Sequence, residues 1–108
     1  MNIPKEIREL SNVVYIIKDE KNKVAYVGQT TKRLRARIGQ HLSGNQTIDK
    51  YLRKCENELI VDVLFHYKRN YQNIEVKLQE KENFYLKEIK KQGYSLLNVS
   101  KVKKFNLI

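Results

Sequence analysis

Two short apolar runs near the N-terminus constrain the fold more than any other feature of this sequence. Residues 12–18 (NVVYIIK) and 24–28 (VAYVG) are rich in β-branched and aromatic side chains, which favour extended strands. The polar residues 19–22 (DEKN) lie between the two runs and are typical of a hairpin loop. The sequence therefore predicts an antiparallel β-hairpin close to the start of the chain.

The rest of the chain predicts helices packed on a small sheet. Leu34, Ile38 and Leu42 recur every fourth residue and predict a helix over residues 32–42, with Thr31 as its N-cap and Gly44 as its stop. The further expected elements are a short helix over 48–56, a strand over 59–67, a helix over 74–92 that ends at Gly93, and a tail over 94–108 with at most a short strand. We expect a single domain over residues 1–108, of the α/β class, with a three-stranded, largely antiparallel sheet flanked by helices.

The predicted hairpin carries two tyrosines, Tyr15 and Tyr26. Symmetric pairing around the loop places Tyr15 opposite Tyr26 and Ile17 opposite Val24, so both phenols point to the same side of the sheet. From spacing alone, simple packing is the first explanation for a pair of this kind. A functional site needs further groups that converge on it.

The predicted helix over residues 32–42 supplies two such groups. At helical spacing, Arg37 and His41 flank the apolar stripe of Leu34, Ile38 and Leu42. Arginine at such a boundary can reach a phosphate with a planar charged fork, and histidine one turn later can orient or exchange a proton. The alternatives are a solvated arginine whose stem is packed and a histidine at the edge of the core.

Glu82 stands out because it lies in the middle of the apolar stripe of the predicted long helix. A buried carboxylate is costly without a partner, so either a salt bridge or a bound cation is expected there. Arg37 is a candidate salt-bridge partner, and Mg²⁺ is a candidate cation because one carboxylate with waters and substrate oxygens can hold it. Asn98, just beyond Gly93, is a weaker candidate for the same site.

The charge of the chain indicates a polyanionic partner. Lys and Arg number 22 against 12 Asp and Glu, a formal net charge of +10, which suits nucleic acid or an anionic membrane surface. The stretch from Lys21 to Lys54 contains nine of the basic residues and one acidic residue, Asp49. The residues expected to contact nucleic acid are Lys32, Arg33, Arg35, Lys50, Arg53 and Lys54.

Other features narrow the class of protein. No apolar run approaches the roughly 20 residues of a membrane span, and the first residues lack the apolar core of a signal peptide, so we expect a soluble, cytoplasmic protein. One cysteine, Cys55, excludes an internal disulfide and, with only two histidines, disfavours a Cys/His zinc site. A metal here would be held by oxygen.

Together these residues resemble the motifs of the GIY-YIG nuclease family. The segments that carry the resemblance are VVY at 13–15, YVG at 26–28, Leu34-x-x-Arg37 followed by His41, Glu82-x-x-Tyr85-Leu86, and Gly93-Tyr94 with Leu97-Asn98. They stand in the family's order, within residues 11–99, with ten residues between the two motif tyrosines as the family has. Val13 and Val27 stand where the family usually has glycine and isoleucine.

The resemblance implies a metal-dependent endonuclease that hydrolyses DNA phosphodiester bonds with one Mg²⁺ or Mn²⁺ ion. In that interpretation Glu82 holds the metal, Arg37 neutralises developing charge, and Tyr15 orients or deprotonates the attacking water. Tyr26 and His41 position phosphate and water, and Asn98 supports the site.

Two other classes of function remain open from the sequence. A nucleic-acid-binding module without chemistry explains the charge but leaves Glu82 unexplained. A membrane-surface protein fits less well, because the charge falls on a short helix and loops rather than on one long basic helix. Biological role, DNA against RNA, and whether the chain acts alone, as a homodimer or with an accessory specificity subunit are not decided by the residues.

Overall fold

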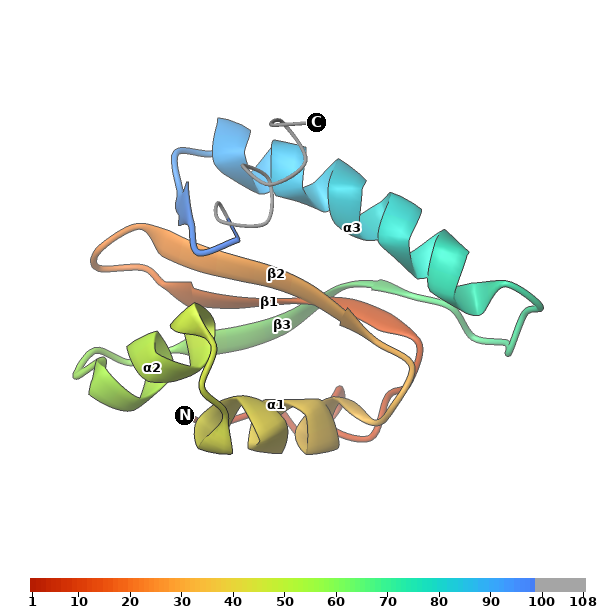
Figure 1. Cartoon of the computed structure of the whole chain (residues 1–108), viewed down its shortest axis with the longest axis horizontal. Coiled ribbons are helices and arrows are strands. Elements are labelled where there is room, and N and C mark those ends of the chain that lie inside the picture. Colours follow the sequence, from red (N-terminus) through yellow and green to blue (C-terminus); the bar gives the residue numbers. More distant parts are fainter. Residues whose placement is uncertain (99–108) are drawn as a thin grey trace.

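The computed structural model describes residues 1–98 and has helices on both faces of one sheet (Figure 1). Helix α3 covers one face, and helices α1 and α2 lie against the other. This confirms the predicted α/β class with a sheet flanked by helices. The elements in chain order are β1 (Val13–Asp19), β2 (Val24–Thr30), α1 (Leu34–Ser43), α2 (Thr47–Lys54), β3 (Ile60–His66), α3 (Ile74–Lys91) and β4 (Ser95–Leu96).

The sheet of the described residues has four strands, so the prediction of three was wrong. The strand order is β3-β1-β2-β4, with β1 antiparallel to both of its neighbours and β4 parallel to β2. Gly93, at a φ of +95°, turns the chain back after α3, as predicted for a left-handed helix end. The Ser95 N–H then donates to the Lys23 carbonyl at 2.8 Å. A strand of two residues is too short to leave a pattern in the sequence. The part of the predicted tail after residue 98 lies outside the described residues.

The predicted pairing of the hairpin was displaced by two residues. Tyr15 pairs with Gly28 and Ile17 pairs with Tyr26, not Tyr15 with Tyr26. Strand β1 extends to Asp19, and the turn uses residues 20–23, with Lys23 in the left-handed region at a φ of 54°. Because side chains alternate with a period of two, a shift of two residues keeps both tyrosines on the same face. They are diagonal neighbours there instead of direct partners.

Two apolar cores lie on the two sheet faces, which explains why strand β1 is apolar along most of its length. Tyr15 and Tyr26 belong to the core under α1 and α2, whereas Val14 and Val27 belong to the core under α3. A strand covered on both faces shows an almost continuous apolar run instead of alternation. The two phenols therefore point towards the layer that contains α1.

Helix α1 starts two residues later than predicted and stops at Gly44, as predicted. It begins at Leu34, and the Thr30 hydroxyl, not Thr31, accepts a nearby backbone hydrogen bond, from the Lys32 N–H at 3.0 Å. The buried residues are Leu34, Ile38 and His41, while Leu42 is 46 % exposed. The prediction that Leu42 belongs to the buried stripe was thus wrong. His41 takes the buried place instead, where it contacts the carboxylate of Asp49.

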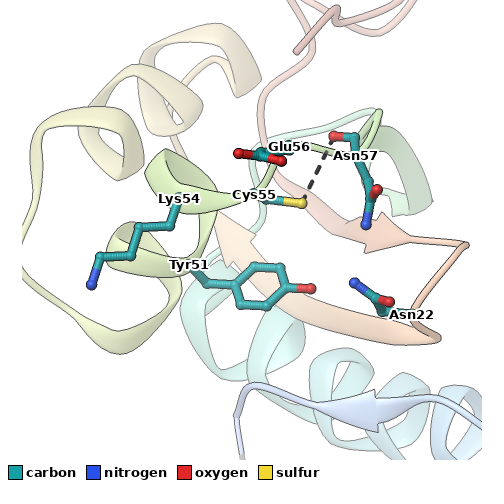
Figure 2. A pocket seen from close by; sticks show the side chains of 6 residues that line it. All are labelled: Asn22, Tyr51, Lys54, Cys55, Glu56 and Asn57. Carbon is teal, nitrogen blue, oxygen red and sulfur yellow. Dashed lines mark hydrogen bonds between the residues drawn. The ribbon is translucent and has the colours of Figure 1, made fainter.

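Helix α2 is fixed to the hairpin through the buried carboxylate of Asp19. This carboxylate accepts hydrogen bonds from the Tyr51 hydroxyl at 2.8 Å and from the side-chain amides of Asn22 at 2.9 Å and Asn57 at 3.1 Å. Figure 2 shows Tyr51, Asn22 and Asn57 pointing towards one another at this junction, with Cys55 close by. Burial alone would raise the pKa of Asp19, but the hydrogen bonds outweigh it and hold the pKa well below its ordinary value. The ionised carboxylate therefore joins two elements that are distant in sequence.

Candidate active site

The two tyrosines of the hairpin lie side by side in the core under α1 and α2. Tyr15 is fully buried and Tyr26 is 3 % exposed, and their ring centroids are 6.3 Å apart. Burial raises the pKa of both phenols, because the charged phenolate would lose its hydration. Both groups are therefore protonated in the resting protein.

Gly28 gives the two phenols the space in which they converge. A Cβ atom at this position would lie 2.6 Å from both Cζ and Oη of Tyr15 and 2.7 Å from Cε2 of Tyr26. Such separations are far inside van der Waals contact. The glycine of the YVG segment is therefore needed for the position of the tyrosines and not for a backbone turn.

Replacing Gly28 by Ala is expected to lower both stability and any activity that depends on Tyr15. The added methyl group displaces a buried ring, and overpacking of this kind costs about 1–3 kcal/mol. The matched control is Gly39→Ala on α1, where a Cβ meets no atom within 4 Å. Thermal melting of the two variants measures the difference, and a Gly28→Ala protein that melts and acts like wild type would contradict this role.

His41 contacts the hydroxyl of Tyr15 directly. Its Nε2 atom lies 2.7 Å from Tyr15 Oη, and its Nδ1 atom lies 2.8 Å from Oδ1 of Asp49. His41 is 1 % exposed and Asp49 is 4 % exposed, so this chain of hydrogen bonds is shielded from water. Sequence reasoning placed His41 near the site but missed Asp49 entirely.

Arg37 lies one helical turn before His41 and is half-buried at the rim of the same group. Its Nη1 atom donates to Oε1 of Gln40 at 3.2 Å. The guanidinium opposes the raised pKa of Tyr15 and of Tyr26, through its positive charge and through hydrogen bonding. The arginine is therefore close enough to act on both phenols.

Glu82 joins the site from α3, although that helix packs on the opposite face of the sheet. It is 7 % exposed, and its negative charge contributes to raising the pKa of both Tyr15 and Tyr26. Strand β4 pairs only with Val24 and Ala25, so it leaves the later part of β2 open to α3. There Nε2 of Gln29 donates to Oε1 of Gln79 on α3, at 2.9 Å. Glu82 lies three positions after Gln79, about one helical turn further along α3.

Asn98 supports the strand that carries Tyr26 and Gly28. Its Oδ1 accepts from the Val27 N–H at 3.1 Å, and its Nδ2 donates to the Val27 carbonyl at 2.7 Å. The side-chain amide thus continues the pairing of β4 by one more step along β2. Asn98 is 2 % exposed and contacts the backbone, so its place in the structure is that of a support beside the site.

A scan of the chain against protein families gives a match to the GIY-YIG catalytic domain over residues 11–95. The match covers most of the chain and includes Tyr15, Tyr26, Arg37, His41 and Glu82. The chain belongs to the GIY-YIG family. This family consists of nucleases that act on DNA. No curated protein and no solved structure matched the chain.

The GIY-YIG motif residues include one carboxylate, that of Glu82. Glu82 supplies a carboxylate beside two phenols, which fits an ion such as Mg²⁺ that keeps several water ligands. Residues 1–98 contain no group of three or more His, Cys, Asp or Glu side chains that would form a complete protein cage. An ion at Glu82 would therefore take its remaining ligands from water and substrate.

A polar pocket of about 430 Å³ opens beside Arg37 in this GIY-YIG chain. Lys32 and Arg37 line it from one side, and Gln79 of α3 lines it from the other. The pocket of Figure 2 is separate, because no residue of the family motifs lines it. The pocket lies between the end of β2 and α3, and Arg37 is the motif residue that lines it.

The residues expected to contact nucleic acid are all exposed, and three of them have partners within the protein. Arg35 Nε lies 2.6 Å and Arg33 Nε 3.5 Å from the carboxylate of Glu9, and Arg53 Nη1 donates to the Gly44 carbonyl at 2.6 Å. The other three residues of this set are Lys32, Lys50 and Lys54. Lys32 lines the pocket beside Arg37, and Lys54 lines the pocket of Figure 2. Within residues 1–98, no helix has the length and apolar character needed to cross a membrane.

Proposed function

We propose that this chain is an endonuclease that hydrolyses DNA phosphodiester bonds by in-line attack of water. The observation that carries the proposal is that one arginine and one buried carboxylate both act electrostatically on two buried phenols. These groups come from β1, β2, α1 and α3, and packing alone does not require a carboxylate among them. A protein that only binds nucleic acid gains nothing from a buried carboxylate at this place, because its negative charge opposes the binding of phosphate.

Arg37 would neutralise the charge that develops on the phosphoryl oxygens. Its guanidinium is held at the rim of the site, so little reorganisation is needed when charge appears, and such preorganised contacts are worth several kcal/mol. The planar fork can engage two phosphoryl oxygens at once. Tyr26, beside Arg37, would help to orient the same phosphate.

Tyr15 would take a proton from the attacking water while it passes its own proton to Nε2 of His41. Because burial raises the pKa of Tyr15, a free phenolate does not accumulate, and the two proton movements must be coupled. The 2.7 Å contact between Tyr15 and His41 supports this route. The water oxygen then bonds to phosphorus as the bond from phosphorus to the 3′ oxygen breaks.

Glu82 would hold Mg²⁺ or Mn²⁺, which stabilises the negative charge of the leaving 3′ oxygen. The exposed residues Lys32, Arg33, Arg35, Lys50, Arg53 and Lys54 would contact the DNA backbone on the α1 and α2 side. Contacts to backbone phosphates position a duplex without reading its sequence. This proposal therefore includes no sequence preference.

Cleavage of a supercoiled plasmid tests the proposed function. Purified protein is expected to produce nicked and linear plasmid with Mg²⁺, and to lose this activity when the metal is removed with a chelator. Restoring the metal should restore cleavage. A protein that binds the plasmid but leaves it intact under all of these conditions would be the non-catalytic binding module instead.

A further inference from the structure

The carboxylate of Asp49 lies behind His41, on the side away from Tyr15. Asp49 is in the first turn of α2, outside every segment that resembles the family motifs. Its Oδ1 lies 2.8 Å from His41 Nδ1, and its Oδ2 accepts the Gln46 N–H at 2.9 Å. Both oxygens of a nearly buried carboxylate are thereby engaged.

These contacts determine which nitrogen of a neutral His41 carries the proton. An ionised carboxylate only accepts hydrogen bonds, so Nδ1 of His41 must be the donor towards Asp49. Nε2 then carries a lone pair and can accept a hydrogen bond, and it is this atom that faces the Tyr15 hydroxyl at 2.7 Å. The Tyr15 hydroxyl must therefore donate to His41, and the proton already points in the direction in which it would leave.

The connection between α1 and α2 is built around this carboxylate. A Cβ atom on Gly44 would lie 2.1 Å from Oδ2 of Asp49 and 3.1 Å from the Gln40 carbonyl. Only a residue without a side chain leaves room for Asp49 at this place. The Gly44 carbonyl is in turn held by Nη1 of Arg53. Gly44 thus leaves room for the Asp49 carboxylate next to His41, and Arg53 holds the connection in this conformation.

We propose that Asp49 is a positioning residue for the hydrolysis. It holds His41 in the tautomer with a proton on Nδ1, so that Nε2 accepts the Tyr15 proton as Tyr15 takes one from the water. The imidazolium that forms carries a positive charge beside the Asp49 carboxylate, which stabilises it until the proton returns to solvent. This role rests on the proposed function, whereas the tautomer follows from the geometry alone.

The decisive substitution is Asp49→Asn, which keeps the shape of the side chain and adds an amide donor. The amide group can donate to His41 Nδ1, which favours the proton on Nε2 and leaves the Tyr15 hydroxyl without an acceptor. The single-turnover cleavage rate at saturating DNA is expected to fall on the order of 10²-fold or more, as for a histidine held in the wrong tautomer. DNA affinity is expected to stay the same, because Asp49 is buried.

Asp49 also contributes to the N-terminus of α2, and a second variant separates this structural role. Gln46→Ala removes the side chain that caps the start of α2 and keeps the backbone N–H that donates to Asp49 Oδ2. This control is expected to lower the melting temperature about as much as Asp49→Asn while leaving the cleavage rate nearly unchanged. Equal rate losses in both variants would show that Asp49 acts only through the helix.

The tautomer of His41 is measurable without any cleavage assay. The chain has two histidines, His41 and His66, so nitrogen NMR of the imidazoles gives two separate patterns. Wild type is expected to show neutral His41 with the proton on Nδ1, and Asp49→Asn to show it on Nε2, with His66 unchanged. A wild-type His41 with the proton on Nε2, or on both nitrogens, would overturn the inference.

The two readouts separate failure of this inference from failure of the proposed function. An active wild type whose rate survives Asp49→Asn overturns the role of Asp49 and leaves the nuclease proposal standing. An inactive wild type overturns the proposed function and, with it, the catalytic role of Asp49. The NMR result then still decides whether Asp49 sets the tautomer.

Discussion

Replacing Glu82 by Gln is expected to abolish metal-dependent cleavage, with a loss on the order of 10³-fold or more in rate. The amide keeps the size of the side chain but is a poor ligand for Mg²⁺, and metal stabilisation of a leaving oxygen is worth several kcal/mol. DNA affinity is expected to be equal or higher, because a negative charge near the phosphate is removed. Single-turnover cleavage and fluorescence anisotropy measure the two effects.

Glu80→Gln on the same helix is the matched control, because Glu80 is exposed. It removes the same charge from α3 without touching the site, and we expect a normal cleavage rate. Metal-dependent cleavage that persists in Glu82→Gln would exclude Glu82 as the metal ligand. A much lower melting temperature with normal cleavage would instead favour the interpretation of Glu82 as a salt-bridge partner.

Substituting Arg37 by Ala is expected to lower the single-turnover rate at saturating DNA by on the order of 10²-fold or more. This is the scale for removing one preorganised contact to the transition state. Arg37→Lys is expected to recover little, because a point charge does not reproduce the two parallel hydrogen bonds of a guanidinium. The rate is measured with protein in excess over DNA and at concentrations that saturate binding, so that weaker binding does not lower it.

Alanine substitutions of Arg33 and Arg35, which are close to Arg37 in the sequence, are the controls for Arg37→Ala. Both side chains are more than half exposed and share the carboxylate of Glu9. Arg33→Ala and Arg35→Ala are therefore expected to weaken DNA binding while the rate at saturation stays near normal. An Arg37→Ala protein that melts several degrees lower but cleaves normally at a permissive temperature would refute a catalytic role for Arg37.

The sequence predicted the elements better than their pairing. Strand β3 and helix α3 were correct to within a residue at each end, because both have long, strongly patterned cores. The hairpin register was not predictable from its apolar pattern, since a shift of two residues leaves the same side chains on the same face. The turn decided it, through the hydrogen bonds of Asn22 to Asp19 and the left-handed Lys23.

Some residues of the candidate site were predictable from the sequence, and Asp49 was not. Tyr15, Tyr26 and His41 carry a spacing signal within one hairpin and one helix, and the structure brings them together. Asp49 carries no such signal, because an aspartate in the first turn of a helix is fully explained by capping. Its second role depends on the turn at Gly44, which determines where α2 lies relative to His41. Tertiary contacts of this kind leave no periodic trace in the sequence.

The contact between Asn98 and Val27 joins residues that are separated by 71 positions, and this separation affects how the chain is made. A ribosome releases the N-terminal part first, so the hairpin exists before residues 95–98 have been added. During that interval the outer edge of β2 presents unpaired backbone groups, and such edges pair readily with strands of other molecules. Residues 95–98 then cover the first part of this edge, from Val24 to Val27. Pairing by residues 95–98 therefore removes a surface through which the newly made chain could associate with other chains.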